Sequence, residues 1–196
     1  MAILPIEAAG SGLEVGRSTT VGAVTDPGAP LALDDLDLSL LAILHAHPRA
    51  GDMELSRLAK VARATVQSRL RRLTEAGVIV SWGPEVDAAA AGFPVQAFVT
   101  LEIAQGALGQ VAEHLASIPQ VLEAYVTTGS ADVLCKVATA SHVELQTTLL
   151  RLNGTSAVVR STSVVTLSVL VAPRILPLLG SASPARSGRA PAYRRA

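Results

Sequence analysis

The hydrophobic residues of this 196-residue chain change their spacing along its length, and this change divides it into two blocks. In the first block, about 33–77, leucines recur every four residues from Leu36 to Leu44, which is the spacing of one face of a helix. In the second block, about 94–172, aliphatic residues occupy every second position from Val95 to Ile103, as in a half-buried strand. A helical block followed by a mixed block predicts an α+β protein with two small domains.

The first block is expected to contain three short helices. Asp34 or Asp35 caps the first helix, and Asp52 caps the second. The third helix runs from about Arg63 to Ala76 and ends at Gly77, since glycine is a common helix terminator. A short strand or wing is expected to follow over residues 78–86. The positions expected to face the core of this block are Leu36, Leu40, Leu44, Leu55, Leu58, Ala59, Val66, Leu70 and Leu73.

The second block has the order β-α-β-β-α-β, which predicts a ferredoxin-like domain with an antiparallel sheet and both helices on one face. The elements after the first strand are expected at Gly106–Ser117, Val121–Thr127, Asp132–Ala138, Ser141–Leu152 and Val158–Val171. The other face of the sheet is left uncovered. Its expected apolar residues are Phe98, Tyr125, Leu134 and Val164.

The formal net charge of zero hides an uneven distribution of charge. Residues 57–72 contain six Lys or Arg and no acid, whereas residues 73–135 contain no Lys or Arg. The basic stretch covers the third helix, whose exposed face carries Gln67, Ser68 and Arg71. Arg can form a bidentate contact to guanine and Gln to adenine, so this face suits the major groove. The residues predicted to contact DNA are Arg57, Lys60, Arg63, Thr65, Gln67, Ser68, Arg69, Arg71 and Arg72.

Within that set, Arg71 and Gln67 are expected to read bases, while Arg69 and Arg72 contact phosphates. Arg57 and Lys60, near the end of the second helix, are expected to straddle the DNA backbone. A basic helix taken alone is more often a solvated surface. The three-helix pattern, the tight turn before the basic helix and the following wing favour DNA binding.

Three motifs make the chain resemble the Lrp/AsnC family of transcription regulators over about residues 33–172. They are Leu33-Asp-Asp-Leu-Asp37, Glu54-Leu-Ser-Arg-Leu-Ala59 and the segment from Thr65 through Arg69-Leu-Arg-Arg-Leu73 to Gly77-Val-Ile79. The resemblance implies a winged helix-turn-helix that binds double-stranded DNA. It also implies a ferredoxin-like domain that forms homodimers, which assemble into tetramers or octamers, and binds an effector such as an amino acid. Ala62 departs from the family, which has a Ser helix cap there; losing that cap costs about 1 kcal/mol.

The same resemblance places an effector at the turn Gly129-Ser-Ala-Asp132, with Ser161 and Ser163 on the last strand. Asp132 can accept hydrogen bonds from an ammonium group. The family's aromatic residue is missing, because Ala131 takes its place. The alternative is purely structural, with Gly129 shaping a hairpin turn and Asp132 stabilising it.

The composition limits the other classes of function. The single cysteine, Cys135, is expected to be a buried strand thiol. No cofactor, metal site or catalytic constellation is predicted, and the uncharged stretches are too short to span a membrane. The protein is therefore expected to be a cytoplasmic regulator without enzymatic activity. The alternatives are a sirohaem-decarboxylase-like enzyme on the same scaffold, or an effector-binding assembly protein that does not bind DNA.

The expected organisation of the chain has five parts. They are a flexible tail at 1–32, the winged helix-turn-helix at 33–82, a linker at 83–93, the ferredoxin-like domain at 94–172 and an Arg-rich flexible tail at 173–196.

Overall fold

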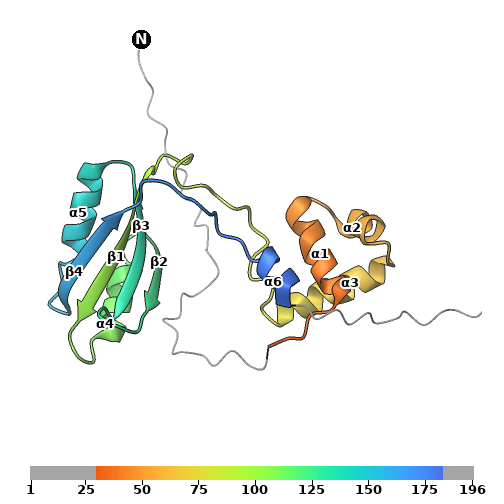
Figure 1. Cartoon of the computed structure of the whole chain (residues 1–196), viewed down its shortest axis with the longest axis horizontal. Helices are drawn as coiled ribbons and strands as arrows, with labels where there is room; N and C mark the ends of the chain where they lie inside the picture. The colour runs from red at the N-terminus through yellow and green to blue at the C-terminus, as the bar shows by residue number, and fades with distance from the viewer. Residues whose placement is uncertain (1–29, 183–196) are drawn as a thin grey trace, which may run out of the picture. The chain divides into compact units, whose positions relative to one another are not determined.

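The computed structural model describes residues 30–182, which form two compact units (Figure 1). The helical unit contains the described residues up to Gly92 together with those from Thr166 onward, and the sheet unit contains Phe93–Val165. Most of the predicted N-terminal tail and the chain after residue 182 lie outside the described residues. Within residues 30–182, no helix is both long and apolar enough to cross a membrane.

The helical unit contains the three predicted helices, α1 (Asp35–Ala46), α2 (Asp52–Ala59) and α3 (Arg63–Glu75). Apolar side chains from all three helices form one core. Its buried members are Leu40, Leu55, Val66 and Leu70. Leu73 is also buried, as predicted, but Leu58 is 41% exposed, so its expected place in the core is wrong.

The start of α1 is stabilised by a reciprocal cap. The Asp34 carboxylate accepts a hydrogen bond from the Asp37 N–H at 2.9 Å, and the Asp37 carboxylate accepts one from the Asp34 N–H at 3.0 Å. Of the two predicted caps, Asp34 is therefore the one used. The predicted cap of α2 is wrong, because Gly51 occupies the N-cap position and Asp52 is the first helical residue.

The two ends of α3 differ. Its N-cap residue, Ala62, makes no side-chain hydrogen bond, as predicted. At the other end Gly77 has a φ of 71°, and the Val78 N–H donates to the Leu73 carbonyl at 2.9 Å. This glycine-dependent arrangement ends the helix at the predicted place.

The predicted wing is not present, since none of residues 78–86 lies in a strand. Two local features oppose pairing there. Pro84 has no N–H to donate, and the Gly83 N–H donates to Ser81 Oγ at 3.0 Å. The confirmed part of the prediction is the helix-turn-helix itself.

The sheet unit has the predicted ferredoxin-like order of elements. They are β1 (Val95–Ile103), α4 (Leu108–Ala116), β2 (Val121–Val126), β3 (Val133–Thr139), α5 (His142–Leu152) and β4 (Val158–Val165). The strands form one antiparallel sheet in the order β2-β3-β1-β4. The helices α4 and α5 lie on the same side of the sheet (Figure 1).

The helix-covered face of the sheet forms the second core. Ala97, Val99 and Leu101 of β1 are fully buried there, together with side chains of α4 and α5. Cys135 is buried in this core, as predicted, and burial raises the pKa of its thiol to about 11. The alternation along β1 therefore identified the buried face correctly.

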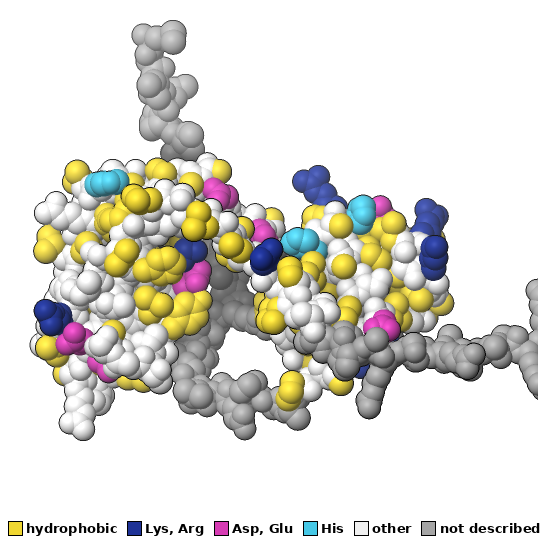
Figure 2. Space-filling model, viewed as in Figure 1, with side chains coloured by type: hydrophobic (Ala, Val, Ile, Leu, Met, Phe, Trp, Pro, Cys, Tyr) yellow, Lys and Arg dark blue, Asp and Glu magenta, His cyan; other side chains and the backbone are white. Residues whose placement is uncertain are grey.

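The opposite face of the sheet is open, with Phe98, Tyr125 and Val164 exposed. Figure 2 shows hydrophobic side chains gathered over the strands of this unit, with basic and acidic side chains among them. Glu123 and Lys136 form an ion pair at 3.5 Å in the same sheet.

The last strand is shorter than predicted, because β4 ends at Val165 and not at Val171. Val165 pairs with Ala97, and β1 begins only two residues before Ala97, so the chain beyond Val165 soon has no strand partner. Leu167 is 97% exposed. The last strand of the predicted ferredoxin-like domain therefore ends six residues earlier than expected.

Residues 176–182, which fall within the predicted flexible tail, form a helix instead, α6 (Leu176–Ala182). This helix packs against α1 inside the helical unit. Leu176 and Leu179, three residues apart, are half-buried. The expectation of a tail is wrong for these residues, because Leu176 and Leu179 form a short apolar stripe on a helix that begins with Leu176 and Pro177.

Candidate nucleic-acid interface

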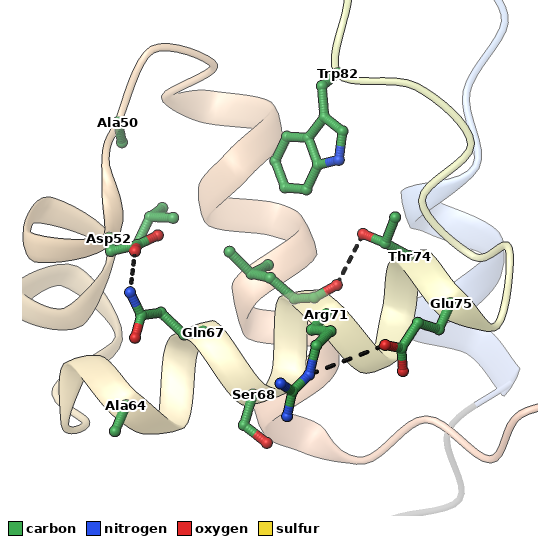
Figure 3. Close-up of a pocket in the computed structure, with 11 residues that line it drawn as sticks. Ala50, Asp52, Ala64, Gln67, Ser68, Arg71, Thr74, Glu75 and Trp82 are labelled. Carbon is green, nitrogen blue, oxygen red and sulfur yellow. Dashed lines mark hydrogen bonds and ion pairs between the residues drawn. The ribbon is translucent and has the colours of Figure 1, made fainter.

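One face of α3 forms a continuous strip along the wall of a surface groove of about 770 Å³ (Figure 3). We call this face the outer strip. It consists of Ala64, Gln67, Ser68, Arg71, Thr74 and Glu75. The spacing of three and four residues places these side chains on one side of the helix. The start of α2 and Trp82 contribute the other walls of the groove.

Arg71 is the one cation of the outer strip. Its side chain is 73% exposed, and its Nε lies 4.0 Å from Glu75 Oε1, one helical turn away. An exposed pair of this kind is weak, so the guanidinium can exchange Glu75 for another acceptor at little cost. Ser68, also exposed, lies beside it on the strip (Figure 3).

Gln67 is held by a residue of the preceding helix. Its Nε2 donates a hydrogen bond to Asp52 Oδ2 at 2.7 Å. Arg63 Nε approaches the same carboxylate oxygen at 3.8 Å. Asp52 therefore gathers two of the predicted DNA-contacting side chains at the N-terminal half of α3.

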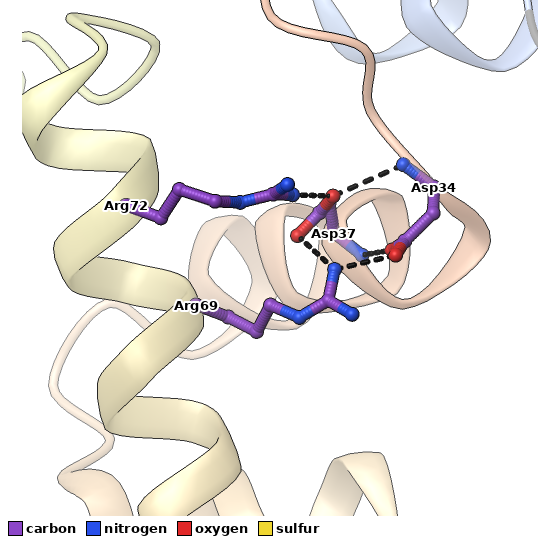
Figure 4. A network of polar contacts seen from close by, with 4 residues as sticks. All are labelled: Asp34, Asp37, Arg69 and Arg72. Carbon is purple, nitrogen blue, oxygen red and sulfur yellow. Dashed lines mark hydrogen bonds and ion pairs between the residues drawn. The ribbon is translucent and has the colours of Figure 1, made fainter.

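Arg69 and Arg72 are turned toward α1 and not toward the groove (Figure 4). Arg69 Nη1 donates to Asp37 Oδ1 at 3.1 Å and also pairs with Asp34, while Arg72 pairs with Asp37. The Asp37 side chain is fully buried. Both arginines thus have an internal role, and their placement gives no support to the predicted phosphate contacts.

The pKa values of this network follow from its contacts. Burial raises the pKa of Asp34, but hydrogen bonds from the Asp37 N–H and from Arg69 outweigh burial and hold that pKa below its ordinary value. The hydrogen bond to Asp34 also raises the pKa of Arg69. The two charges therefore stabilise each other.

The remaining predicted contacts lie near the turn between α2 and α3. Arg57 is exposed in the last turn of α2, Arg63 is exposed at the start of α3 and Thr65 is half-buried. Lys60 ends α2 with a left-handed φ of 55°. The turn thus presents three cations in addition to Arg71.

The predicted effector residues lie in the sheet unit. Leu101 of β1 pairs with Val133 on one side and with Ser161 on the other, so Asp132 and Ser161 flank β1 at nearly the same level. Ser163 lies two residues farther along β4. Gly129 has a φ of 119°, which a glycine tolerates in this turn.

Asp132 already has a structural contact, because its Oδ2 accepts a hydrogen bond from the Ile103 N–H at 2.8 Å. This contact agrees with the structural alternative for that residue. Its second carboxylate oxygen remains available as an acceptor.

Sequence reasoning missed two residues of the site, Asp52 as a partner of Gln67 and Trp82 as a wall of the groove. The signal for Trp82 was its rarity, since it is the only tryptophan of the chain. Asp52 gave no such signal, because an acid in the first turn of a helix has a sufficient local explanation.

Two family models match the chain, one in each unit. An AsnC-type helix-turn-helix domain matches residues 33–74, and an Lrp/AsnC ligand binding domain matches residues 96–176. The HTH-type transcriptional regulator FL11 of Pyrococcus horikoshii is 34% identical over 113 residues, which cover 58% of this chain and 75% of that protein.

Solved structures show the same fold. Escherichia coli AsnC aligns with a TM-score of 0.70 at 24% identity, covering 75% of this chain and 100% of that chain. A transcriptional regulator of Neisseria meningitidis, in complex with L-Met, aligns with a TM-score of 0.67 at 22% identity, covering 72% of this chain and 94% of that chain.

Proposed function

Because the chain belongs to the Lrp/AsnC family of transcription regulators, we propose that it recognises specific DNA sequences through the outer strip of α3. The observation that carries this proposal is the exposure of Arg71 on a helix face that also presents Gln67 and Ser68. These side chains offer the donors and acceptors that read base edges in the major groove.

The cations of the α2–α3 turn are assigned to the DNA backbone. Arg57, Lys60 and Arg63 flank the N-terminal half of α3, where phosphates would lie if the helix enters the groove. Contacts to phosphates position a protein on DNA but carry no sequence information. Arg69 and Arg72 are not part of this set, because they are paired within the domain.

The test is a titration of the full chain with double-stranded DNA that has been selected from a randomised pool. Trp82 is 61% exposed beside the outer strip, so its fluorescence reports binding directly. We expect the logarithm of affinity to fall with the logarithm of salt concentration, with a slope of about −0.9 per phosphate neutralised.

Arg57→Ala and Lys60→Asn should each reduce the steepness of that slope by about one and weaken binding to all sequences alike. Lys60 is replaced by Asn because Asn tolerates the left-handed φ of this position. Failure to enrich any sequence, or a slope near zero, contradicts the proposal.

The regulator is further proposed to act as a homodimer that joins the open faces of two sheets and assembles into tetramers or octamers. Phe98, Tyr125 and Val164 support this, because helices cover only the other face. A two-fold dimer places two α3 helices on successive half-sites. Sedimentation should show that Val164→Glu dissociates the dimer, whereas Val143→Glu, at an exposed position of α5, should not. A monomeric wild type contradicts this part.

An amino acid is the proposed effector, bound near Gly129, Asp132, Ser161 and Ser163. The family's ligand-binding domain supports this, as does the L-Met complex of the Neisseria regulator. Thermal-shift screening against the twenty amino acids should identify it, because a ligand that binds only the folded protein raises its melting temperature. Asp132→Asn should remove the shift. Twenty null results contradict an amino-acid effector and leave the DNA proposal intact.

A further inference from the structure

We infer that Asp52 is a positioning residue for base recognition, because its carboxylate fixes the orientation of the Gln67 amide on the outer strip. The inference rests on the proposed DNA binding and deepens it by assigning one determinant of sequence preference. It concerns a residue of α2 that lies outside the face expected to touch bases.

The geometry links the two helices through a single carboxylate (Figure 3). Asp52 is the first residue of α2, and Gln67 lies in the second turn of α3, fifteen residues later. The distance from Gln67 Nε2 to Asp52 Oδ2 is 2.7 Å. The Asp52 side chain is only 34% exposed, so the contact is partly shielded from water.

An ionised carboxylate can only accept hydrogen bonds, and this property selects one of the two orientations of the Gln67 amide. With Oε1 turned toward Asp52, two acceptors would face each other. With Nε2 turned toward Asp52, Gln67 keeps its Oε1 and one N–H for another partner. One acceptor and one donor are what a bidentate contact to adenine requires.

The fold does not need this hydrogen bond to hold the two helices together. Leu55 of α2 is buried against Val66 and Leu70 of α3, in the same core. The value of the Asp52 contact is therefore expected to lie in the ordering of an exposed side chain. Ordering one such side chain before binding is worth about 0.5–1.5 kcal/mol, or about 2- to 12-fold in affinity.

That gain applies only to sequences whose bases engage Gln67. Asp52 should therefore raise the preference for one base pair, while its negative charge weakens binding to every sequence by repelling phosphates. These two effects have different signatures, so they can be separated by experiment.

The test uses Asp52→Asn, which keeps the size of the side chain but replaces the carboxylate with an amide that can both donate and accept. The matched control is Glu54→Gln, which removes the same charge from the same turn of α2. Within residues 30–182 the Glu54 side chain has no hydrogen bond or ion pair, so this control alters only the charge. Both variants are made in the full chain, alone and with Gln67→Ala.

Each protein is first used to select double-stranded DNA from a randomised pool. Comparison of the wild type with Gln67→Ala identifies the base pair that Gln67 reads. We expect Asp52→Asn to lower the preference at that pair by about 2- to 12-fold, while Glu54→Gln leaves it unchanged. Both variants should bind sequences that lack this base pair somewhat more tightly, because each removes a negative charge. In the Gln67→Ala background, Asp52→Asn should have no further effect on preference.

Three results would overturn the inference. The first is an Asp52→Asn preference equal to that of the wild type. The second is an unchanged preference in Gln67→Ala, since Gln67 then reads no base. The third is a melting temperature of Asp52→Asn several degrees below that of Glu54→Gln, because it would show that the main role of Asp52 is to stabilise the fold. If the wild type selects no sequence at all, the proposed function fails first and the inference fails with it.

Discussion

The two sides of α3 carry arginines with different tasks. On the side that faces α1, Arg69 and Arg72 pair with Asp34 and the buried Asp37. On the outer strip, Arg71 has only an exposed glutamate at 4.0 Å. A cluster of basic residues in the sequence therefore does not by itself identify a DNA-binding surface. The role of each residue depends on which groups its side chain contacts in the fold.

The largest expected effect comes from removing the carboxylate that organises the inner side. Asp37→Ala leaves two arginines without their buried partner and also removes half of the cap on α1. We expect the free energy of unfolding of the helical unit to fall by about 3 kcal/mol. Thermal or urea unfolding measures this, with Asp35→Ala as the control in the same first turn, since Asp35 is exposed.

A loss similar to that of the control, below about 0.5 kcal/mol, would show that the inner network is dispensable. The distinction between the two sides of α3 would then have no energetic basis.

A smaller effect is expected at the N-terminus of α3, which supports both the side that faces α1 and the outer strip. Ala62 provides no side-chain cap, so Ala62→Ser should stabilise the helical unit by about 1 kcal/mol through a new hydrogen bond to a free N–H of the first turn. Base preference should not change, because residue 62 precedes the outer strip. Unfolding and DNA selection together check this, and a changed preference would show that the helix start also affects the outer strip.

The smallest effect is a pH dependence that belongs to the inner side. The pKa of Asp34 is lowered in the folded state, so its contribution to stability is fully present above the ordinary aspartate pKa of about 4. It is lost as the pH falls below that value. Unfolding measured from pH 6 to pH 3 should show this loss in Arg71→Ala but less of it in Arg69→Ala. Equal acid sensitivity in both variants would contradict the assignment of this pH dependence to the contact between Asp34 and Arg69.

Much of the fold follows from periodicity in the sequence. Four-residue and two-residue spacings identified the three helices and the buried face of β1, because burial repeats with the geometry of each element. The end of β4 could not be predicted, since it depends on where β1 begins. The helix α6 was missed because its few leucines lie in a segment, residues 173–196, whose Pro, Ser, Gly and Arg content is typical of a flexible tail.

The site was predictable only in part, because periodicity shows which side of a helix is buried but not what each side chain contacts. The sequence identified Arg71, Gln67 and Ser68 as an exposed polar face, since that face lies opposite the buried Val66, Leu70 and Leu73. It could not show that Arg69 and Arg72 meet Asp37, more than thirty residues earlier. Periodicity gives the side of a helix, but the partner across the interface depends on the tertiary fold.

The most direct test of the central claim is the sequence preference of Arg71→Ala. Affinities for the selected DNA and for a scrambled duplex are measured at one salt concentration, alongside the melting temperature. We predict that the ratio of the two affinities falls at least fivefold, since a bidentate Arg contact is worth about 1–3 kcal/mol of discrimination, while stability stays within about 0.5 kcal/mol. An unchanged ratio in a folded Arg71→Ala protein would contradict the claim that the outer strip of α3 reads DNA.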